Sequence, residues 1–444
     1  MFTKKDLWKL IAPLIVEQFL AVAIGMADTI MVTSCGEEAL SAVSNVDAIN
    51  ILLINIFSAL ATGGAIVASQ FIGREDDGSA CVAAKQLLMV TTIISVVIMG
   101  GCLLGGDGLL GLIYGGAEPL IMENSRVYFF WSALSYPFIA IYNAGAALFR
   151  AMGNSRVSMM TAILMNVLNI SGNALLIFGF QMGVAGAAIS SLVSRMAGAV
   201  LIILLLRFRP HRIHFDRIFR LDFQPKMVRN ILAIGVPSGL ENGMFQVGKI
   251  LVQSLVVSLG TASIAANAVG NSVAALPQIP GAAIGLAMIT VVGQCVGAGR
   301  LEEAKAYTFK LTGLAYAAMI PLCIVEICTA APVVSLFDLS GEGAALAVQL
   351  LTYHGVTCSL LWPASFVMPN GLRAANDVRF TMTVSMLSMW IFRIGFSYLL
   401  VNWLELGILG VWIAMTVDWL VRVVVFLFRL FSGRWKRHAM ASGA

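Results

Sequence analysis

The sequence predicts an all-α integral membrane protein with twelve transmembrane helices, arranged as two pseudo-symmetric six-helix lobes around a central cleft. Of its 444 residues, 59% are hydrophobic and only 11% are charged, whereas soluble domains carry about 25% charged residues. Apolar runs of about 20 residues recur along the chain, which suits helices that cross a bilayer. The alternation over about ten residues that is typical of membrane barrel strands is absent. The two halves also share residues at a constant spacing, which indicates an internal repeat.

Apolar runs bounded by Gly, Pro and charged residues define twelve spans, six on each side of a basic segment near the middle of the chain. A helix satisfies its own backbone hydrogen bonds in lipid, so the side chains of these spans must carry any function. The spans lie at about residues 9–33, 44–72, 82–104, 127–149, 157–179, 184–206, 229–258, 262–296, 306–330, 345–369, 379–402 and 407–429.

The second group of six spans repeats the first at a constant offset, the one that separates Pro13 from Pro237. Because six spans is an even number, both copies have the same orientation in the membrane, as parallel repeats of transporters do. We therefore expect an N-terminal lobe at residues 1–206, a basic cytoplasmic linker at 207–228, and a C-terminal lobe with a short basic tail at 229–444. The matched pairs are Pro13 and Pro237, Glu17 and Glu241, Gly36 and Gly260, Gln70 and Gln294, Gly73 and Gly297, Gly183 and Gly407, and Gly186 and Gly410, with Arg150 and Arg373, and Arg156 and Arg379, near the same offset.

Lys and Arg residues predict the orientation of the chain. The segment Arg207–Arg229 holds seven of them, and Pro210 and Pro225 prevent a continuous helix across it. If the N-terminus is inside, 23 Lys and Arg residues near the span ends fall on the cytoplasmic side and only Arg126 falls outside. We expect a multi-pass protein of the cytoplasmic membrane with both termini in the cytoplasm. Contact of the linker with anionic lipid is an alternative role for its charge.

Several classes of function are excluded by what the sequence lacks. It has no phosphate-binding GxxxxGK[ST] motif and no soluble stretch long enough for an ATPase domain, so pumping would use a gradient of H⁺ or Na⁺. It has no clustered His, paired carboxylates or nucleophile with a base, so we do not expect an enzyme or a cofactor. Its seven cysteines are scattered singly, which favours small buried residues over metal or disulfide roles. The expected partners are a small organic substrate and the bilayer, with no nucleic acid and no ATPase subunit, and we expect a monomer.

Charged residues inside the spans cost about 2.5 to 3.5 kcal/mol each near mid-membrane, so each needs a partner, water or a function. Asp418 and Arg422 are spaced i, i+4 and are expected to pair. Glu326 and Asp47 are predicted to lie near the outer surface and to reach water. Arg195 and Arg393 have no evident partner on their own spans.

Asp28 is a different case, because no basic residue lies near it on the span 9–33. A lone carboxylate in a partly dry helix bundle is suited to bind and release a proton or to hold Na⁺. The alternative is a carboxylate that hydroxyl and amide neighbours satisfy.

Polar residues form stripes on three otherwise apolar spans, and the helical spacing within the spans 157–179 and 229–258 places most of them on one face. Such stripes indicate either a hydrated cavity or hydrogen bonds between helices. Because there are three of them, we predict a cavity that holds the substrate. The stripes consist of Asn166, Asn169 and Asn173; of Glu241, Asn242, Gln246, Lys249 and Gln253; and of Asn267 and Asn271.

Helix-breaking residues occur at corresponding places in the two halves. Gly63 and Gly64 are expected to interrupt the span 44–72, and Pro277, Pro280, Gly281 and Gly285 the span 262–296. Interruptions at matching positions point to moving parts or a binding site. Ordinary kinks without a function are the alternative.

Segments spread over nearly the whole chain resemble the multidrug and toxic compound extrusion (MATE) family. They are ADTIMVTSCGEEALSAV from residue 27, VASQFIG from 67, FRAMGNSRVSMMTAILMNVLNISGNALLIFG from 149, GLENGMFQVGK from 239 and VVGQCVGAGRLEEA from 291. The resemblance implies two six-helix lobes that form a V-shaped cleft. It also implies antiport of H⁺ or Na⁺ against organic compounds, which are often cationic and aromatic.

The resemblance also implies roles for particular residues. Asp28 matches the family's acid in the first helix, which binds the coupling cation, and Asn173 occupies the position of a second acid found in one prokaryotic branch. Asp28 is then the sole acid of this site, with Asn173 and Asn169 as amide neighbours, and it is the candidate ligand for Na⁺. A second cation site in the C-terminal lobe is not expected, because Phe245 and Trp362 stand near the positions of its acids.

These inferences predict a cation-coupled antiporter that exports organic, cationic or amphipathic compounds by alternating access. The predicted coupling residues are Asp28, Asn173 and Asn169, and the polar stripes of the spans 229–258 and 262–296 are predicted to line the substrate cleft. The alternative is a flippase of lipid-linked or other anionic precursors with the same architecture, because Lys249 would suit an anionic headgroup.

Overall fold

The structure, a computed structural model, describes residues 1–116, 118–208, 211–214, 223–337 and 339–441. Over these residues it contains helices and no strand. Ten of the described helical segments are long and apolar enough to cross a membrane. These ten, together with α4 and α7 of 33 residues each, correspond in order to the twelve predicted spans, although α2 begins at Glu37, α3 ends at Tyr114 and α4 begins at Pro119, each well beyond the predicted bound. The predicted fold class is therefore confirmed.

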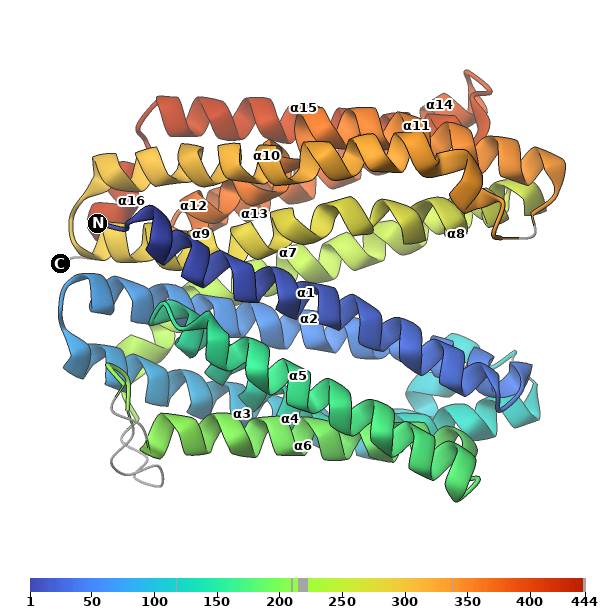
Figure 1. The fold of residues 1–444 in the computed structure, drawn as a ribbon, viewed down its shortest axis with the longest axis horizontal. Coiled ribbons are helices and arrows are strands. Elements are labelled where there is room, and N and C mark those ends of the chain that lie inside the picture. The colour runs from blue at the N-terminus through green and yellow to red at the C-terminus, as the bar shows by residue number, and fades with distance from the viewer. Residues whose placement is uncertain (117, 209–210, 215–222, 338, 442–444) are drawn as a thin grey trace. The chain divides into compact units, whose positions relative to one another are not determined.

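The helices of the first half have these bounds (Figure 1). They are α1 (Lys4–Thr33), α2 (Glu37–Gly73), α3 (Asp77–Tyr114), α4 (Pro119–Ala151), α5 (Ser155–Asn173), which the π-helical segment η1 (Ala174–Gly179) continues, and α6 (Gly183–Phe208).

The helices of the second half contain more interruptions. They are α7 (Pro225–Val257), α8 (Thr261–Ala274), η2 (Leu276–Gln278), α9 (Ile279–Gly297), α10 (Leu301–Val334), α11 (Gly341–Trp362), η3 (Pro363–Val367), α12 (Pro369–Ala374), α13 (Val378–Ser388), η4 (Met389–Gly395), α14 (Phe396–Asn402), α15 (Gly407–Phe431) and α16 (Lys436–Ala441).

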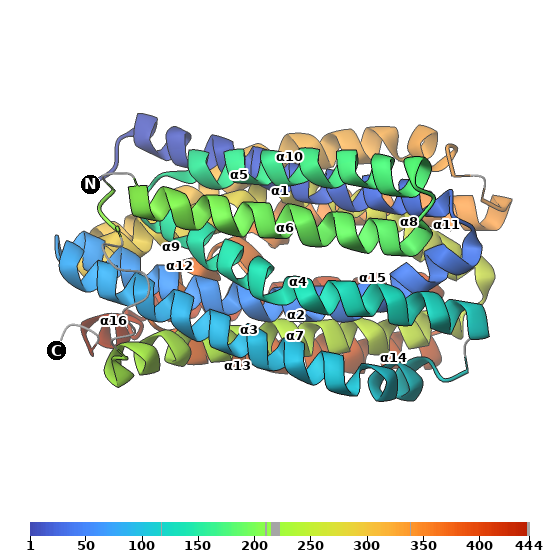
Figure 2. The ribbon, with the colours of Figure 1, turned by 90° about the horizontal axis from the view of Figure 1, so that it is seen from below.

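The chain divides into two compact units, Thr3–Gly239 and Leu240–Ala444, and Met1–Phe2 belong to the second. In the first unit, α4 packs against α2, α3 and α6, and α5 packs against α1 and α6 (Figures 1 and 2). In the second unit, α10 packs against α9 and α11, and α11 also contacts α8. The lobe boundaries at residues 207–228 stay a prediction, because part of that segment lies outside the described residues.

The internal repeat is visible in the backbone. Residues with a positive φ angle occur in pairs that have the same separation as Pro13 and Pro237, at the turns that end or begin helices. Glycine adopts this conformation without a steric cost, which explains why it occupies most of these places. The pairs, with φ in degrees, are Gly36 (110) and Gly260 (95), Glu75 (63) and Gly299 (73), Gln181 (54) and Glu405 (52), and Gly183 (55) and Gly407 (56).

Each unit also contains one buried Glu–Arg ion pair formed by residues of the repeat. Arg150 of α4 donates to Glu17 of α1 at 2.9 Å, and Arg373 of α12 donates to Glu241 of α7 at 2.6 Å. Ser158 of α5 donates to the second oxygen of Glu17 at 2.6 Å, so the first pair joins three helices. The repeated carboxylates are therefore paired inside each unit.

The predicted interruptions have different outcomes in the two halves. Pro277 and Pro280 do accompany a break, because α8 ends at Ala274 and the 3₁₀ turn η2 precedes α9. The prediction for Gly63 and Gly64 is wrong, because α2 runs continuously from Glu37 to Gly73. It is also wrong for Gly281 and Gly285, because both lie inside the continuous helix α9.

Close helix packing explains the two glycines of α2. A Cβ atom on Gly63 would lie 2.7 Å from the backbone nitrogen of Gly235, which belongs to the part of α7 in the first unit. A Cβ atom on Gly64 would lie 2.4 Å from the side chain of Leu87 on α3. Glycine is needed here for the approach of neighbouring helices rather than for a kink.

We expect Gly63→Ala to lower the free energy of unfolding by about 1 to 3 kcal/mol, because the added methyl group meets backbone atoms that cannot rotate away. Thermal unfolding of the purified protein in detergent measures the change. Gly100→Ala is the matched control, because a Cβ atom at this helical position has no neighbour within 4 Å. Equal melting temperatures for the two variants would contradict the packing argument.

The repeated ion pairs generate a second prediction. Arg150→Gln leaves the Glu17 carboxylate buried without its cation, and removal of one partner from a buried pair costs about 3 kcal/mol or more. The double variant Glu17→Gln with Arg150→Gln leaves no uncompensated charge, so we expect it to unfold at a higher temperature than the single variant. A double variant that is no more stable than Arg150→Gln would show that the pair does not stabilise the first unit.

Candidate coupling and substrate sites

A hydrogen bond from α5 to α1 forms the centre of the first candidate site. The Asn173 side-chain nitrogen Nδ2 donates to Oδ1 of Asp28 at 2.5 Å. The same nitrogen lies 3.4 Å from Oδ1 of Asn169, one turn earlier on α5. The structure thus brings together the three residues predicted to bind the coupling cation, while their role stays a prediction.

One side-chain amide oxygen of α5 beside Asp28 is buried without a hydrogen-bond partner among the described residues. Asn169 is held on both sides, because its Nδ2 donates to Ser191 of α6 at 3.0 Å and its backbone oxygen accepts from Ser190 at 2.7 Å. Asn173 is fully buried, and its Oδ1 has no hydrogen-bond partner among the described residues. A buried carbonyl oxygen without a partner is costly. Oδ1 of Asn173 is therefore a candidate ligand for a cation beside Asp28, or a candidate acceptor for a hydrogen-bond donor there.

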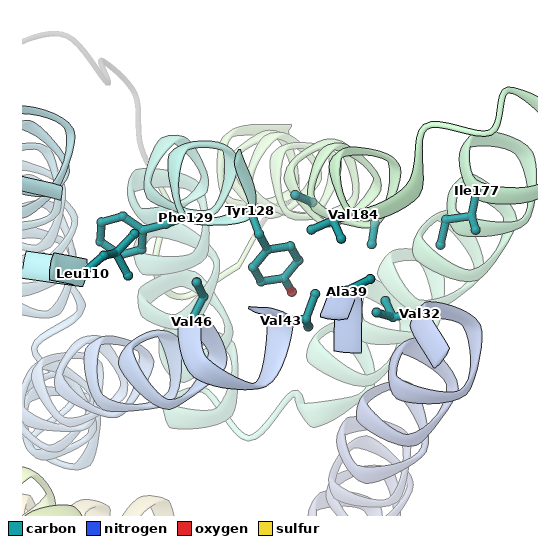
Figure 3. Packing of buried hydrophobic residues seen from close by; sticks show 11 residues of the cluster. Val32, Ala39, Val43, Val46, Leu110, Tyr128, Phe129, Ile177 and Val184 are labelled. Atoms are coloured by element: carbon teal, nitrogen blue, oxygen red, sulfur yellow. The ribbon is translucent and has the colours of Figure 1, made fainter. Parts of the chain in front are cut away.

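Buried apolar residues form a cluster in the first unit (Figure 3). Val32 and Ile177 belong to it, and each follows a site residue by one helical turn: Val32 follows Asp28, and Ile177 follows Asn173. Residues four apart share a helix face, so the polar contact and the cluster adjoin along α1 and along the α5–η1 segment. Low polarity beside a charge strengthens its electrostatic interactions.

A second polar network accompanies Asp28 in the first unit. Asp47 of α2 accepts hydrogen bonds from Asn50 at 3.1 Å and from Tyr128 of α4 at 3.3 Å. Arg195 of α6 donates to Ser135 of α4 at 2.6 Å, a partner that is not evident in the sequence. Asp47 and Arg195 are the charged groups that act electrostatically on Asp28. Only the i, i+3 spacing of Asp47 and Asn50 could have revealed part of this network.

The prediction for Glu326 is wrong. Its side chain on α10 is 1% exposed, and its carboxylate lies 2.9 Å from Nδ1 of His354 on α11, which is also 1% exposed. The partner is 28 residues away on another helix, so no spacing rule within one span could indicate it. By contrast, the expected pair of Asp418 and Arg422 is confirmed, with Nε and Oδ1 2.8 Å apart.

The residues predicted to line the substrate cleft divide into two groups in the second unit. One group is a network near the end of α7, in which Asn267 donates to Gln253 at 3.0 Å and accepts from Trp412 at 3.0 Å. Asn271 donates to the backbone oxygen of Asn267 at 2.9 Å. Gln253 lies twelve residues, or about 18 Å of helix, from Glu241. Gln253, Asn267 and Asn271 are therefore linked by hydrogen bonds to one another, and Asn267 is also linked to α15.

The other group lies near Leu240, where the part of α7 that belongs to the second unit begins. Glu241 pairs with Arg373, and both line a cavity of about 210 Å³ together with Asn242. Gln246 is half-buried. The ammonium of Lys249 lies 5.2 Å from the centroid of the Phe245 ring, which also lines the cavity. Whether these residues contact a transported compound stays a prediction.

The described residues contain no group of three or more His, Cys, Asp and Glu side chains that could hold a metal ion. A sodium ion at Asp28 would therefore take its remaining ligands from amide, hydroxyl or backbone oxygens, which hard cations accept. Oδ1 of Asn173 is such an oxygen.

Comparisons with known proteins match most of this chain to one family model and to named relatives. The family model MatE matches residues 13–175 and 237–399, two ranges that are separated by the offset of the internal repeat. The chain is 26% identical over 448 residues to the uncharacterized transporter YisQ of Bacillus subtilis (strain 168), with 98% of this chain and 96% of YisQ covered. It is 24% identical over 447 residues to the probable multidrug resistance protein NorM of Thermotoga maritima, with 98% and 94% covered.

Solved structures support the fold. The outward-facing conformation of a multidrug resistance MATE family transporter of the MOP superfamily matches with a TM-score of 0.91 and 22% identity, over 98% of this chain and 97% of that one. A MATE crystal structure in the bent conformation matches with a TM-score of 0.90 and 21% identity, over 98% and 97%. The helices, the repeat and the family model agree, and so the chain belongs to the MatE family and is a multi-pass MATE transporter rather than an enzyme.

Proposed function

We propose that this protein is an antiporter of the cytoplasmic membrane that exports organic, cationic or amphipathic compounds and is driven by H⁺ or Na⁺. The observation that carries the proposal is the contact of Asp28 with Asn173, a carboxylate that faces an amide with one unpartnered oxygen. The relatives named as probable multidrug resistance proteins support organic compounds as cargo and favour export over the flippase alternative. Both termini face the cytoplasm, and one chain suffices because it contains both repeats.

The internal repeat distinguishes carboxylates that have a structural role from the proposed coupling residue, Asp28. Glu17 recurs as Glu241, and each forms an ion pair with an arginine in its own unit. Asp28 does not recur, because Val252 occupies the equivalent position in the second half. A residue that both halves need for folding would be expected in both. The restriction of Asp28 to the first unit therefore supports a role in transport.

Cation binding changes the contact between α1 and α5. The charged carboxylate of Asp28 accepts a hydrogen bond from Asn173. Once Asp28 is protonated, the neutral carboxyl group accepts this hydrogen bond more weakly. Sodium would instead be held between the carboxylate and Oδ1 of Asn173. In both cases the negative charge at this contact is neutralised, and α1 and α5 are free to adopt another arrangement.

Alternating access converts this local change into export. The cation favours one arrangement of the transporter and the organic compound favours the other, so each promotes the release of its counterpart. One elementary charge that moves through ~100 mV provides about 2.3 kcal/mol, which supports a roughly 50-fold gradient of a neutral substrate. No ATPase is needed for export on this scale.

We expect Asp28→Asn to abolish gradient-driven efflux of a fluorescent organic compound from vesicles, with a fall of about tenfold or more. An imposed H⁺ gradient and an imposed Na⁺ gradient, tested separately, identify the ion that drives the wild-type protein. Size-exclusion chromatography shows whether the variant is folded.

Asp107→Asn is the matched control, because Asp107 is an exposed carboxylate of α3 in an ion pair with Arg126. We expect its transport to equal that of the wild type. Unchanged transport by Asp28→Asn would place the coupling cation elsewhere. A folded wild-type protein that transports no organic compound with either gradient would overturn the proposed function.

Asn173→Val separates the two ions by the sign of its effect. For Na⁺, the change removes a ligand oxygen, so we expect the concentration for half-maximal transport to rise about tenfold, which corresponds to about 1.4 kcal/mol. For H⁺, it removes a hydrogen bond that stabilises the carboxylate, so half-maximal transport needs less H⁺. Titration of the transport rate against each ion measures the shift, and no shift with either ion would exclude Asn173 from the site.

A further inference from the structure

The cavity of about 210 Å³ lies wholly within the second unit. Residues of α7, η3, α12, α13, η4 and α15 line it, and its aromatic walls are Phe245, Phe366 and Trp390. Pockets for drug-sized molecules measure about 300 to 1,000 Å³. This cavity therefore suits one aromatic ring or one polar headgroup rather than a whole drug-sized molecule.

Positive charges outnumber negative ones around this cavity. Arg373 and Arg422 line it, and each is offset by one carboxylate, Glu241 and Asp418 respectively. Arg422, which is 3% exposed, also lies 5.3 Å from the centroid of Phe366.

Two further cations lie against the Phe245 ring. Lys249 and Arg393 are 5.2 and 5.3 Å from its centroid. Among the described residues, neither has a carboxylate within 4 Å. The ring attracts them through its quadrupole, a weaker compensation than an ion pair. The four cations and two carboxylates thus leave an excess of two positive charges.

Hydrogen-bond donors without partners also line the cavity. Nε of Arg373 and the hydroxyl of Ser365 are buried and have no hydrogen-bond partner among the described residues. One acceptor, Oδ2 of Asp418, is also without a partner, but Asp418 does not line the cavity. Buried donors without partners favour a ligand that supplies acceptor oxygens.

We propose that this cavity binds the anionic group of the exported compound, so that the substrates include aromatic or amphipathic organic anions. The carboxylate, sulfonate or phosphate of the ligand accepts hydrogen bonds from Arg373 and Ser365. Its ring packs against Phe245, Phe366 and Trp390, and Lys249 and Arg393 supply the remaining attraction. This inference rests on the proposed function, because it takes the ligand to be the transported substrate, and it specifies that the amphipathic substrates include anions.

Equilibrium binding tests the proposal with three probes of the same size: 2-naphthoate, uncharged 2-naphthamide and cationic 2-naphthylmethylamine. Isothermal titration calorimetry uses the full-length protein in phosphatidylcholine nanodiscs, without an ion gradient. We expect naphthoate to bind at least tenfold more tightly than the other two probes. Equal or tighter binding of either other probe would overturn the proposal.

Lys249→Gln and Arg393→Gln are the informative variants, because neither residue takes part in an ion pair whose loss would threaten folding. We expect each to weaken naphthoate binding about tenfold and to leave naphthamide binding unchanged. Lys310→Gln is the matched control, because Lys310 lies 5.5 Å from the Tyr307 ring elsewhere in the same unit. An equal effect of Lys310→Gln, or no effect of the two cavity variants, would overturn the assignment.

Anionic lipid is the other source of the same chemistry. Nanodiscs that contain phosphatidylglycerol test it, and retention of naphthoate binding in them supports the organic anion. Loss of binding in these discs would assign the cavity to lipid headgroups and overturn the proposal. Because binding is measured without a gradient, a protein that binds naphthoate but exports nothing would refute the proposed function and not this inference.

Discussion

A charge inside a membrane protein requires compensation, and this constraint organises the polar residues of the structure. Ion pairs join Glu17 with Arg150, Glu241 with Arg373, and Asp418 with Arg422. Glu326 lies 2.9 Å from a ring nitrogen of His354, within hydrogen-bond distance. The exceptions are informative: Asp28 contacts a neutral amide, while Lys249 and Arg393 lie against the Phe245 ring and have no carboxylate within 4 Å among the described residues. Charges without a charged partner are costly and are retained mainly where they function.

The repeat sharpens this distinction. The features that recur in both halves are those that build each unit, namely the glycine turns and the buried Glu–Arg pair. The exceptional charges do not recur. Asp28 lies in the first unit, whereas the cationic aromatic cavity lies in the second. Duplication thus supplied two similar scaffolds, and chemistry that is specific to each distinguishes them.

Features that depend on local composition could be predicted from the sequence, whereas contacts between residues far apart in the chain could not. Apolar length located the twelve spans, and the i, i+4 spacing revealed the pair of Asp418 and Arg422, because both signals lie within one helix. The partner of Glu326 could not be predicted, since His354 is on another helix and a lone histidine has no periodic signal. Gly63 was misread as a kink, because the sequence does not show that the backbone of Gly235 approaches it. The polar stripe included Glu241 and Asn242 of the cavity, but its aromatic walls could not be predicted, since they come from distant segments of the chain.

The two sites together determine how strongly the membrane potential can drive transport. A monovalent organic cation exported for one H⁺ or Na⁺ moves no net charge, so the potential contributes nothing to that exchange. With the cytoplasm negative, inward movement of one cation and outward movement of one anion are each favoured by about 2.3 kcal/mol per 100 mV. Their sum of about 4.6 kcal/mol corresponds to a gradient of roughly 2,000-fold. If the proposed cation site at Asp28 and the proposed anion site in the second unit both act in transport, the membrane potential is a sufficient source of energy for export, without an ion concentration gradient.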